Sequence, residues 1–289
     1  MKSCSITVDV EEYFQVEAFS NNISQSDWGN YESRICFQTE LLLETFEQSN
    51  VQATFFILGC VADKHPEIVR KIANRGHEIA SHGYNHQHIT KISQTDFISD
   101  ITKSKSLLED ISAKEVIGYR APCFSITPDN LWAHDEIKNA GYKYSSSTYP
   151  ITHDLYGVPL APRTPYLLDN GLLEIPVSTA KLFNKTIPAA GGGFFRLFPY
   201  PLFKFLLNRA YSETGMINFY THPWEYDPEQ PKLNGSIKSN FRHHVNQKTA
   251  LKKLQKLAKQ YNFEPLRAIH MSKNYPKLGA WSDIAKGRY

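Results

Sequence analysis

The chain of 289 residues is long enough to bury a large core, and its 41% hydrophobic and 21% charged residues are typical of a globular rather than a disordered protein. A formal net charge of +3, without a basic stripe beyond the helix-like residues 248–259, predicts no nucleic-acid partner. No apolar run approaches the length of about 18 residues that a membrane helix needs, so the sequence predicts no membrane span.

The predicted elements alternate between strands and helices. In chain order they are a strand over 4–10, a helix over 32–48, a strand over 51–59, a helix over 66–76, a strand over 78–80, a helix over 95–110, a strand over 116–119, a helix over 129–140, a strand from 142 to 145, a helix over 201–213, a strand over 216–221 and a helix over 247–261. Short connections between such elements are typical of parallel βαβ units.

This alternation predicts an α/β fold, a single elaborated and distorted (β/α) barrel that spans residues 1–289. Residues 1–150 would form the core βα units, and residues 201–289 the closing strands and helices. Between them, residues 150–200 are rich in Pro, Gly and aromatic side chains, which predicts a long excursion from the barrel. This excursion suits either the wall of a saccharide groove or a contact between subunits of a homo-oligomer.

The cysteines and the first residues of the chain indicate in which cellular compartment the protein works. The four cysteines show no CxxC spacing, so neither a zinc ribbon nor a disulfide framework is expected. The acids Asp9 and Glu11 leave no room before them for an apolar signal region and a cleavage site. If the chain is full length, this predicts a cytoplasmic protein.

Acidic side chains follow the first predicted strand. Carboxylates at the carboxyl end of a strand project into the mouth of an α/β barrel, where chemistry is usually done. Asp9 and Glu11 are two residues apart and would share one face of a continued strand. The alternative from the residues alone is a solvated turn with helix-capping acids.

Two histidines follow the third predicted strand. His82 and His86 have the i, i+4 spacing that places two imidazoles on one side of a helical turn, close enough to share an ion. Neutral imidazole suits zinc, cobalt, nickel or iron. The alternative is a pair of surface or capping histidines.

Four segments, taken in order, resemble the motifs of the polysaccharide deacetylase family, the NodB-like carbohydrate esterases. They are Asp9-x-Glu11, Ser81-His82-x-x-x-His86, Arg120-Ala121-Pro122-Cys123 and Phe219-Tyr220-Thr221-His222. Two further segments resemble the branch of this family that is associated with exopolysaccharide gene clusters, namely Ala190-Gly191-Gly192-Gly193-Phe194-Phe195-Arg196 and Thr221-His222-Pro223-Trp224-Glu225.

The resemblance implies one divalent metal, zinc foremost, held by Glu11, His82 and His86. Two imidazoles and one carboxylate leave open positions for water and a substrate carbonyl, and the ion would polarise that carbonyl and lower the pKa of the water. The sequence departs from the common family pattern at two positions, and the first concerns the metal ligands. Val10 stands where most relatives have the metal-binding aspartate, so the third ligand becomes Glu11, with Glu12 as the alternative.

The resemblance also implies the catalytic roles. Asp9 would be the general base, Arg120 would pair with it, and His222 would protonate the leaving amine. The backbone N–H of Cys123, after Pro122, would stabilise the oxyanion.

The second departure is Ser145, which stands where many relatives have an acid that tunes the catalytic histidine. Glu174, Asp154 and Glu225 are the candidate substitutes.

The leading hypothesis is a metal-dependent hydrolase that removes an N-acetyl group from an N-acetylhexosamine in a saccharide. An allantoinase- or deformylase-like hydrolase of a small amide on the same fold is the second hypothesis. A catalytically inactive saccharide-binding scaffold is the third. The retained acids and histidines argue against the scaffold.

Overall fold

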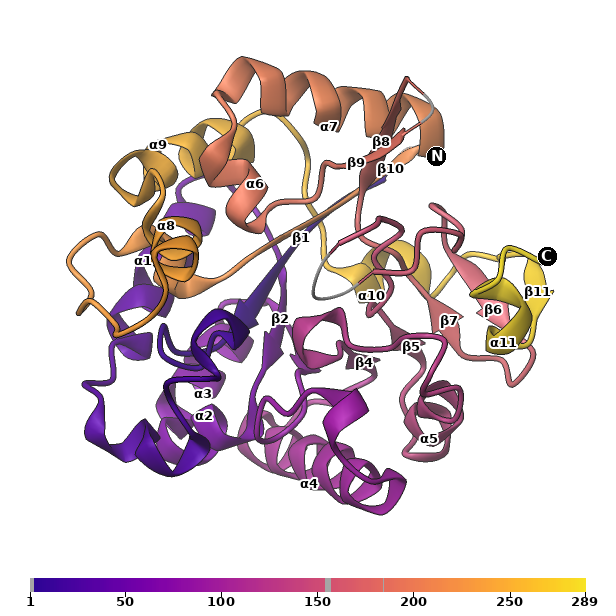
Figure 1. The fold of residues 1–289 in the computed structure, drawn as a ribbon, viewed down its shortest axis with the longest axis horizontal. Helices are drawn as coiled ribbons and strands as arrows, with labels where there is room; N and C mark the ends of the chain where they lie inside the picture. The colour runs from indigo at the N-terminus through magenta and orange to yellow at the C-terminus, as the bar shows by residue number, and fades with distance from the viewer. Residues whose placement is uncertain (1–2, 154–156, 184) are drawn as a thin grey trace.

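Nine strands of the computed structural model form one twisted sheet, which lies at the centre of the molecule with helices around it (Figure 1). The structure describes residues 3–153, 157–183 and 185–289. The strand order is β10-β1-β2-β3-β4-β5-β7-β6-β11, and all neighbours are parallel except β6 and β7. The strands are β1 (Ser3–Val10), β2 (Thr54–Ile57), β3 (Glu78–Ser81), β4 (Gly118–Tyr119), β5 (Tyr144–Ser145), β6 (Tyr166–Leu168), β7 (Leu173–Glu174), β10 (Met216–Thr221) and β11 (Lys277–Gly279).

The residues after β7 close this sheet into a distorted barrel. The Ile175 N–H donates to the carbonyl of Ser145 on β5 at 2.8 Å, and three residues later the Ser178 N–H donates to the carbonyl of Asn218 on β10 at 3.1 Å. The Asn218 side chain also donates to the carbonyl of Ile175 at 3.3 Å. The predicted α/β fold built from parallel units is confirmed.

The sequence of β1 explains its position. Cys4, Ile6 and Val8 pack in the main hydrophobic core between sheet and helices. The alternate residues face the barrel interior, where the Thr7 hydroxyl donates to the carbonyl of Phe219 at 3.1 Å. Since successive side chains of a strand point to opposite faces, one strand carries both the apolar face that fixes it and the polar face that ends in the site.

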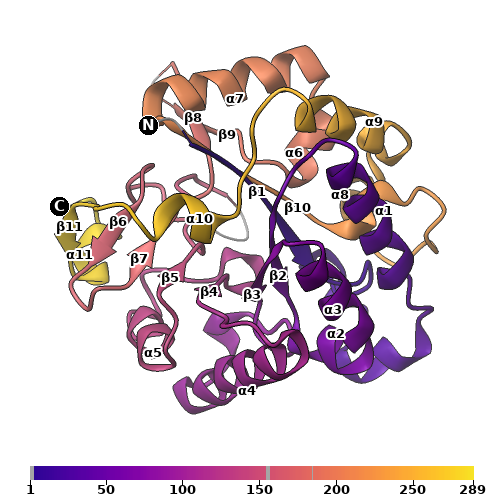
Figure 2. The ribbon, with the colours of Figure 1, turned by 180° about the vertical axis from the view of Figure 1, so that it is seen from behind.

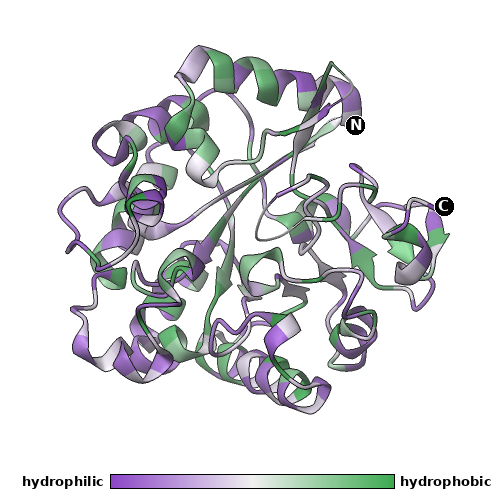
Figure 3. Ribbon diagram, viewed as in Figure 1, coloured by the Kyte–Doolittle hydropathy of each residue, from purple (hydrophilic) through white to green (hydrophobic). Residues whose placement is uncertain are grey.

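Helices cover the outside of the strands, and Figure 2 shows them from behind. Figure 3 shows green, apolar residues alternating with purple, polar ones along the helices that surround the sheet. The helices are α1 (Ile35–Glu47), α2 (Gly59–Lys64), α3 (Pro66–Asn74), α4 (Gln94–Ser112), α5 (Ala133–Asn139), α6 (Gly192–Leu197), α7 (Tyr200–Thr214), α8 (Ile237–His244), α9 (Gln247–Ala258), α10 (Leu266–His270) and α11 (Trp281–Ile284). In the part of the chain that is described, no helix has the length and apolar character needed to cross a bilayer.

The region 150–200 is more regular than the sequence predicts. It contributes β6 and β7 to the central sheet, and it adds a hairpin of β8 (Thr179–Leu182) and β9 (Lys185–Pro188) that packs beside α7. These strands have two to four residues, which is too short for a period-two pattern to stand out among Pro and Gly.

His77, after α3, is a buried histidine whose state affects stability. Its Nδ1 accepts the N–H of Ala53 at 3.2 Å, and its ring packs against Phe55 with a centroid separation of 5.0 Å. Burial lowers the pKa of His77 to about 4. The folded protein therefore keeps this imidazole neutral at pH values where an unfolded chain protonates it.

We expect this histidine to contribute stability that is fully present above about pH 6.5 and is lost as the pH falls toward 4. Urea unfolding at about pH 7 and about pH 5 should show that His77→Asn reduces the pH-dependent loss of unfolding free energy by about 2 kcal/mol relative to the native chain. His88→Asn is the matched control and should leave the loss unchanged. An unchanged loss in His77→Asn would contradict the assignment.

Candidate active site

Three potential metal ligands meet at the carboxyl ends of β1 and β3. One donor atom from each of Glu11, His82 and His86 lies within 4.8 Å of the other two, and all three residues are buried. The His86 Nε2 lies 2.7 Å from Glu11 Oε2. One carboxylate and two imidazoles are a donor set that zinc and related divalent ions accept.

The two histidines do not lie on a helical turn, contrary to the sequence-based prediction. β3 ends at Ser81, and His82 and His86 lie in the loop that follows, with their ring centroids 5.4 Å apart. His86 adopts a φ of 52°, so a reversal of the loop rather than a helix brings its ring back toward His82. Asp100 of α4 holds this loop by accepting the N–H groups of Tyr84 at 2.7 Å and Asn85 at 3.1 Å.

Neighbouring groups orient the potential ligands. The His82 Nδ1 lies 2.8 Å from the carbonyl oxygen of Arg120, which turns Nε2 toward the cluster. The Trp224 Nε1–H donates to Glu11 Oε1 at 3.1 Å. Glu12, the alternative ligand, instead accepts a hydrogen bond from the Ser33 hydroxyl and is turned away from the histidines. The structure therefore places Glu11, and not Glu12, in the cluster.

Asp9 and Arg120 form a fully buried ion pair beside this cluster. The Arg120 Nη1–H donates to Asp9 Oδ1 at 2.7 Å and to the Thr7 hydroxyl at 2.7 Å. The other Asp9 oxygen lies 3.9 Å from His222 Nε2. The carboxylate thus has one oxygen fixed by the guanidinium and the other turned toward the histidine.

His222, which follows β10, is held by Glu225. The Nδ1 of His222 lies 2.6 Å from Glu225 Oε1, and the backbone N–H of His222 donates to the same oxygen at 3.0 Å. Burial lowers the pKa of His222, but the negative charge of Glu11 and the hydrogen bond to Glu225 outweigh it and raise that pKa to about 9. The imidazole therefore carries a proton near neutral pH.

Arg196, on α6, holds Glu225 in turn. Its Nε–H donates to Glu225 Oε2 at 2.8 Å, and its Nη1–H donates to the carbonyl of His243 on α8 at 2.7 Å. Both side chains of the pair are nearly inaccessible to solvent, with 2% and 0% exposed. The sequence motif that ends at Arg196 assigned this residue no role. The structure shows that Arg196 links α6, α8 and Glu225, the acid that holds His222.

Of the two candidate acids that the structure describes, Glu225 is the one that contacts His222. Glu174 lies elsewhere, with its Oε2 3.3 Å from His134 Nε2 and its Oε1 accepting the N–H of Ser147. Asp154 is outside the described residues. The signal for Glu225 in the sequence is its position three residues after the histidine, where a side chain returns to the start of a helical turn.

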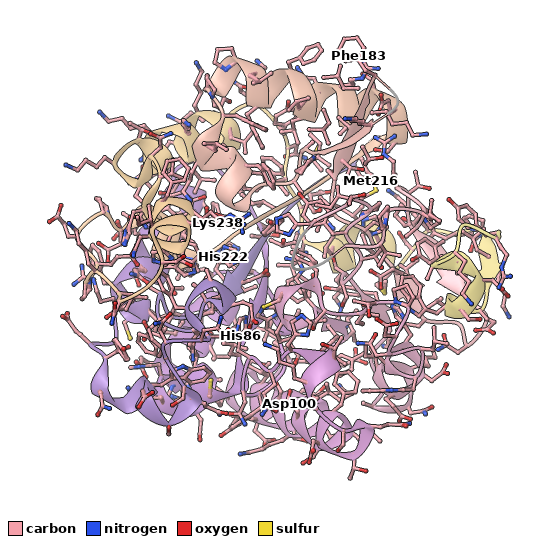
Figure 4. All side chains as sticks on the ribbon, in the orientation of Figure 1. His86, Asp100, Phe183, Met216, His222 and Lys238 are labelled. Carbon is pink, nitrogen blue, oxygen red and sulfur yellow. The ribbon has the colours of Figure 1, made fainter. Side chains whose placement is uncertain are left out.

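A cavity of about 410 Å³ opens over these groups. Its wall includes Asp9, Glu11, His82, His86, Ala121, Cys123, Phe124, His153, Phe194, Arg196, Leu197, Tyr220, His222, Trp224, Lys238, Phe241, Arg242 and His243. Figure 4 shows His86, His222 and Lys238 in one region, while Met216 lies at the other end of β10. Cys123 lines the cavity, whereas Pro122 is buried and does not line it within the described residues. Tyr156 of the aromatic excursion is outside the described residues.

Two family models match consecutive parts of the chain. Residues 36–145 match the model described as polysaccharide deacetylase, and residues 146–271 match a domain of unknown function, DUF3473. The match to the polysaccharide deacetylase model covers residues 36–145. This part supplies His82, His86 and Arg120, whereas the DUF3473 part supplies Arg196, His222 and Glu225.

Curated peptidoglycan deacetylases match about a third of the chain. A peptidoglycan-N-acetylglucosamine deacetylase of Bacillus cereus is 35% identical over 99 residues, which are 34% of this chain and 36% of the relative. A peptidoglycan deacetylase of Helicobacter pylori is 30% identical over 109 residues, 37% of this chain and 35% of the relative. The chain thus spans about a third of the length of these relatives.

The solved structures show the fold alone, because their sequence identities are low. A Mycobacterium smegmatis protein assigned to the polysaccharide deacetylases superposes with a TM-score of 0.59 at 20% identity, covering 99% of this chain and 90% of that chain. The Bc1960 peptidoglycan N-acetylglucosamine deacetylase has a TM-score of 0.53 at 17% identity, covering 94% and 90%.

We expect Glu225→Gln to lower the pKa of His222 by about one to three units in the metal-free protein, because the neutral amide no longer favours the imidazolium. NMR titration of the His222 ring checks this shift without an assay of activity. The exposed Glu229→Gln on the same loop is the matched control and should leave the titration in place. A His222 titration that Glu225→Gln does not move would disprove the electrostatic role of Glu225.

Proposed function

We propose that this chain is a metal-dependent deacetylase that hydrolyses the N-acetyl group of an N-acetylhexosamine in a saccharide. The observation that carries the proposal is the arrangement in one cavity of a carboxylate, Asp9, an imidazole, His222, and the Glu11–His82–His86 cluster. The names of the peptidoglycan deacetylase relatives support the same chemistry. An amide hydrolase needs a base for water and an acid for the amine, and this cavity offers both.

The cluster Glu11–His82–His86 would hold the divalent metal, for which zinc is our first choice and cobalt, nickel and iron are alternatives. Such an ion, when bound, polarises an amide carbonyl and makes water more acidic. The contacts of His82 Nδ1 with the Arg120 carbonyl and of Trp224 with Glu11 keep the ligand atoms turned toward one another.

Asp9 would take the proton from the attacking water. Arg120 and Thr7 fix its position, because one carboxylate oxygen accepts from the guanidinium, which itself is bound to the Thr7 hydroxyl. The other oxygen is turned toward His222 and the cavity. A base held in this way has one proton-accepting atom in a defined place.

His222 would protonate the leaving amine through Nε2, because Nδ1 is engaged by Glu225. The contact with Glu225 favours the imidazolium, which would carry the proton that the amine needs. The backbone N–H of Cys123, in the cavity wall, would donate to the oxyanion of the tetrahedral intermediate. We place the chain in the exopolysaccharide-associated branch, since the two segments that carry that resemblance supply Arg196 and Glu225.

The first test measures acetate release from N-acetylglucosamine oligomers by purified, metal-loaded protein. We expect Asp9→Asn to lower kcat by about 10²–10⁴-fold while the bound metal remains, because Asp9 is the base and not a ligand. His82→Ala should lose both metal and activity. Metal binding without acetate release in the native protein would reject the deacetylase, and turnover of cyclic amides or formamides would then favour the small-amide hydrolase.

The second test concerns Arg196. Arg196→Lys keeps the charge but lacks the planar set of donors that joins Glu225 to the α8 carbonyls. We expect kcat to fall by about tenfold or more with little change in KM, and the alkaline limb of the pH profile to move to lower pH, because Glu225 holds His222 less firmly. The control Arg209→Lys, an exposed i,i+4 pair with Glu213, should behave as the native chain. An equal loss in both variants, or a change in KM alone, contradicts the positioning role.

A further inference from the structure

A second cluster of potential metal ligands lies on the outer surface, at the start of α1 and the junction of α2 and α3. It consists of Cys36, His65 and Glu67, each of which offers one ligand atom to a common point. The Cys36 Sγ lies 3.4 Å from His65 Nδ1 and 3.4 Å from Glu67 Oε1, and His65 Nδ1 lies 3.4 Å from Glu67 Oε1. The three atoms thus form an equilateral triangle.

These separations match a tetrahedral metal. Zinc lies about 2.3 Å from thiolate sulfur, and about 2.0–2.1 Å from imidazole nitrogen and carboxylate oxygen. Tetrahedral angles then place the ligand atoms about 3.3–3.6 Å from one another. The triangle of Cys36, His65 and Glu67 has this size on all three sides, and its open face leaves a fourth position for water.

The surroundings orient the ligands as they do in metal sites. The Ser33 hydroxyl lies 3.0 Å from His65 Nε2, so the second ring nitrogen is occupied and Nδ1 is directed toward the sulfur. Ser33 also donates to the buried carboxylate of Glu12. Glu12, Ser33 and His65 are thus linked in series by hydrogen bonds. Such a chain fixes the tautomer and the ring orientation of a ligating histidine.

The scaffold beneath the cluster is rigid. Pro66 begins α3 directly between His65 and Glu67, and a proline at the first helical position fixes the local backbone. α1 and α3 are joined a few residues further on, where Glu40 accepts from Lys71 at 2.9 Å and from Arg75 at 2.6 Å. The two helices therefore hold Cys36 opposite the other two ligands without the metal.

We propose that Cys36, His65 and Glu67 form a second divalent-metal site, selective for zinc-like ions and separate from the Glu11–His82–His86 cluster. A mixed set of thiolate, imidazole and carboxylate suits zinc and cobalt and is poorly suited to magnesium or calcium. Burial and the neighbouring Glu67 raise the pKa of the Cys36 thiol to about 11, so the metal-free thiol is protonated near neutral pH and its proton passes to solvent when the ion binds. The bound ion ties the start of α1 to the start of α3.

Titration of the metal-free protein with Co²⁺ tests this site directly. A cobalt–thiolate bond gives a charge-transfer band in the near ultraviolet, and Glu11, His82 and His86 offer no thiolate, so loss of the band with Cys36 assigns it to the outer cluster. We expect the band in the native protein and in His82→Ala, and its loss in Cys36→Ser. The matched control Cys60→Ser should keep it.

Metal analysis of the zinc-loaded proteins separates the two sites. We expect about two equivalents in the native chain and in Cys60→Ser, and about one in Cys36→Ser, in Glu67→Gln and in His82→Ala. Glu67 is more than half exposed, so its substitution leaves the fold intact and guards against a misfolded Cys36 variant. Absence of the cobalt–thiolate band in the native protein, or its persistence in Cys36→Ser, would overturn the second site. Neither result depends on deacetylase activity, so the two proposals can fail independently.

Discussion

The buried guanidinium of Arg120 is the constraint on which the barrel interior depends. A charge without solvent contact is tolerated only when its donors are paired. Arg120 donates to Asp9 and Thr7 on β1 and to the carbonyl and hydroxyl of Ser146 after β5. Its Cζ lies 4.1 Å from the ring centroid of Phe56. Loss of one partner of such a buried pair costs about 3–5 kcal/mol. The same contacts that satisfy the charge therefore fix the end of β1, and with it the position of Asp9 and of Glu11 two residues later.

The DUF3473 part completes this site. Its strand β10 pairs with β1 in parallel, so the carboxyl ends of the two strands meet and His222 arrives opposite Asp9. It also supplies Glu225, which holds His222 and is itself held by Arg196. The Ser145 hydroxyl, on β5, donates to Ser147 at 2.8 Å and does not contact His222.

The sequence predicted the position of site residues that lie at strand ends, but it did not predict the conformation of the loop that carries the two histidines. β1 could be placed with its acids at the barrel mouth because its apolar and polar residues alternate and its end is marked by Asp9 and Glu11. The loop of His82 and His86 could not be derived from spacing, since Asp100, far along the chain on α4, determines its path. Glu225, by contrast, lies three residues after His222, and its contact with that ring is local to one turn. Glu174 reaches His134 through a tertiary contact that spacing does not show.

Glu12 connects the two metal-ligand clusters. Its neighbour Glu11 faces His86, whereas Glu12 points to the opposite side of the chain and reaches Ser33, which in turn contacts His65 of the outer cluster. One short stretch of backbone directly after β1 therefore serves both clusters. An ion on the outer cluster would hold His65 and, through Ser33, the carboxylate of Glu12. The end of β1 would then be fixed from the barrel interior by Arg120 and from the surface by the second ion. Both contacts would restrict the motion of the Glu11 side chain. The position of this side chain decides whether the inner cluster can bind its metal.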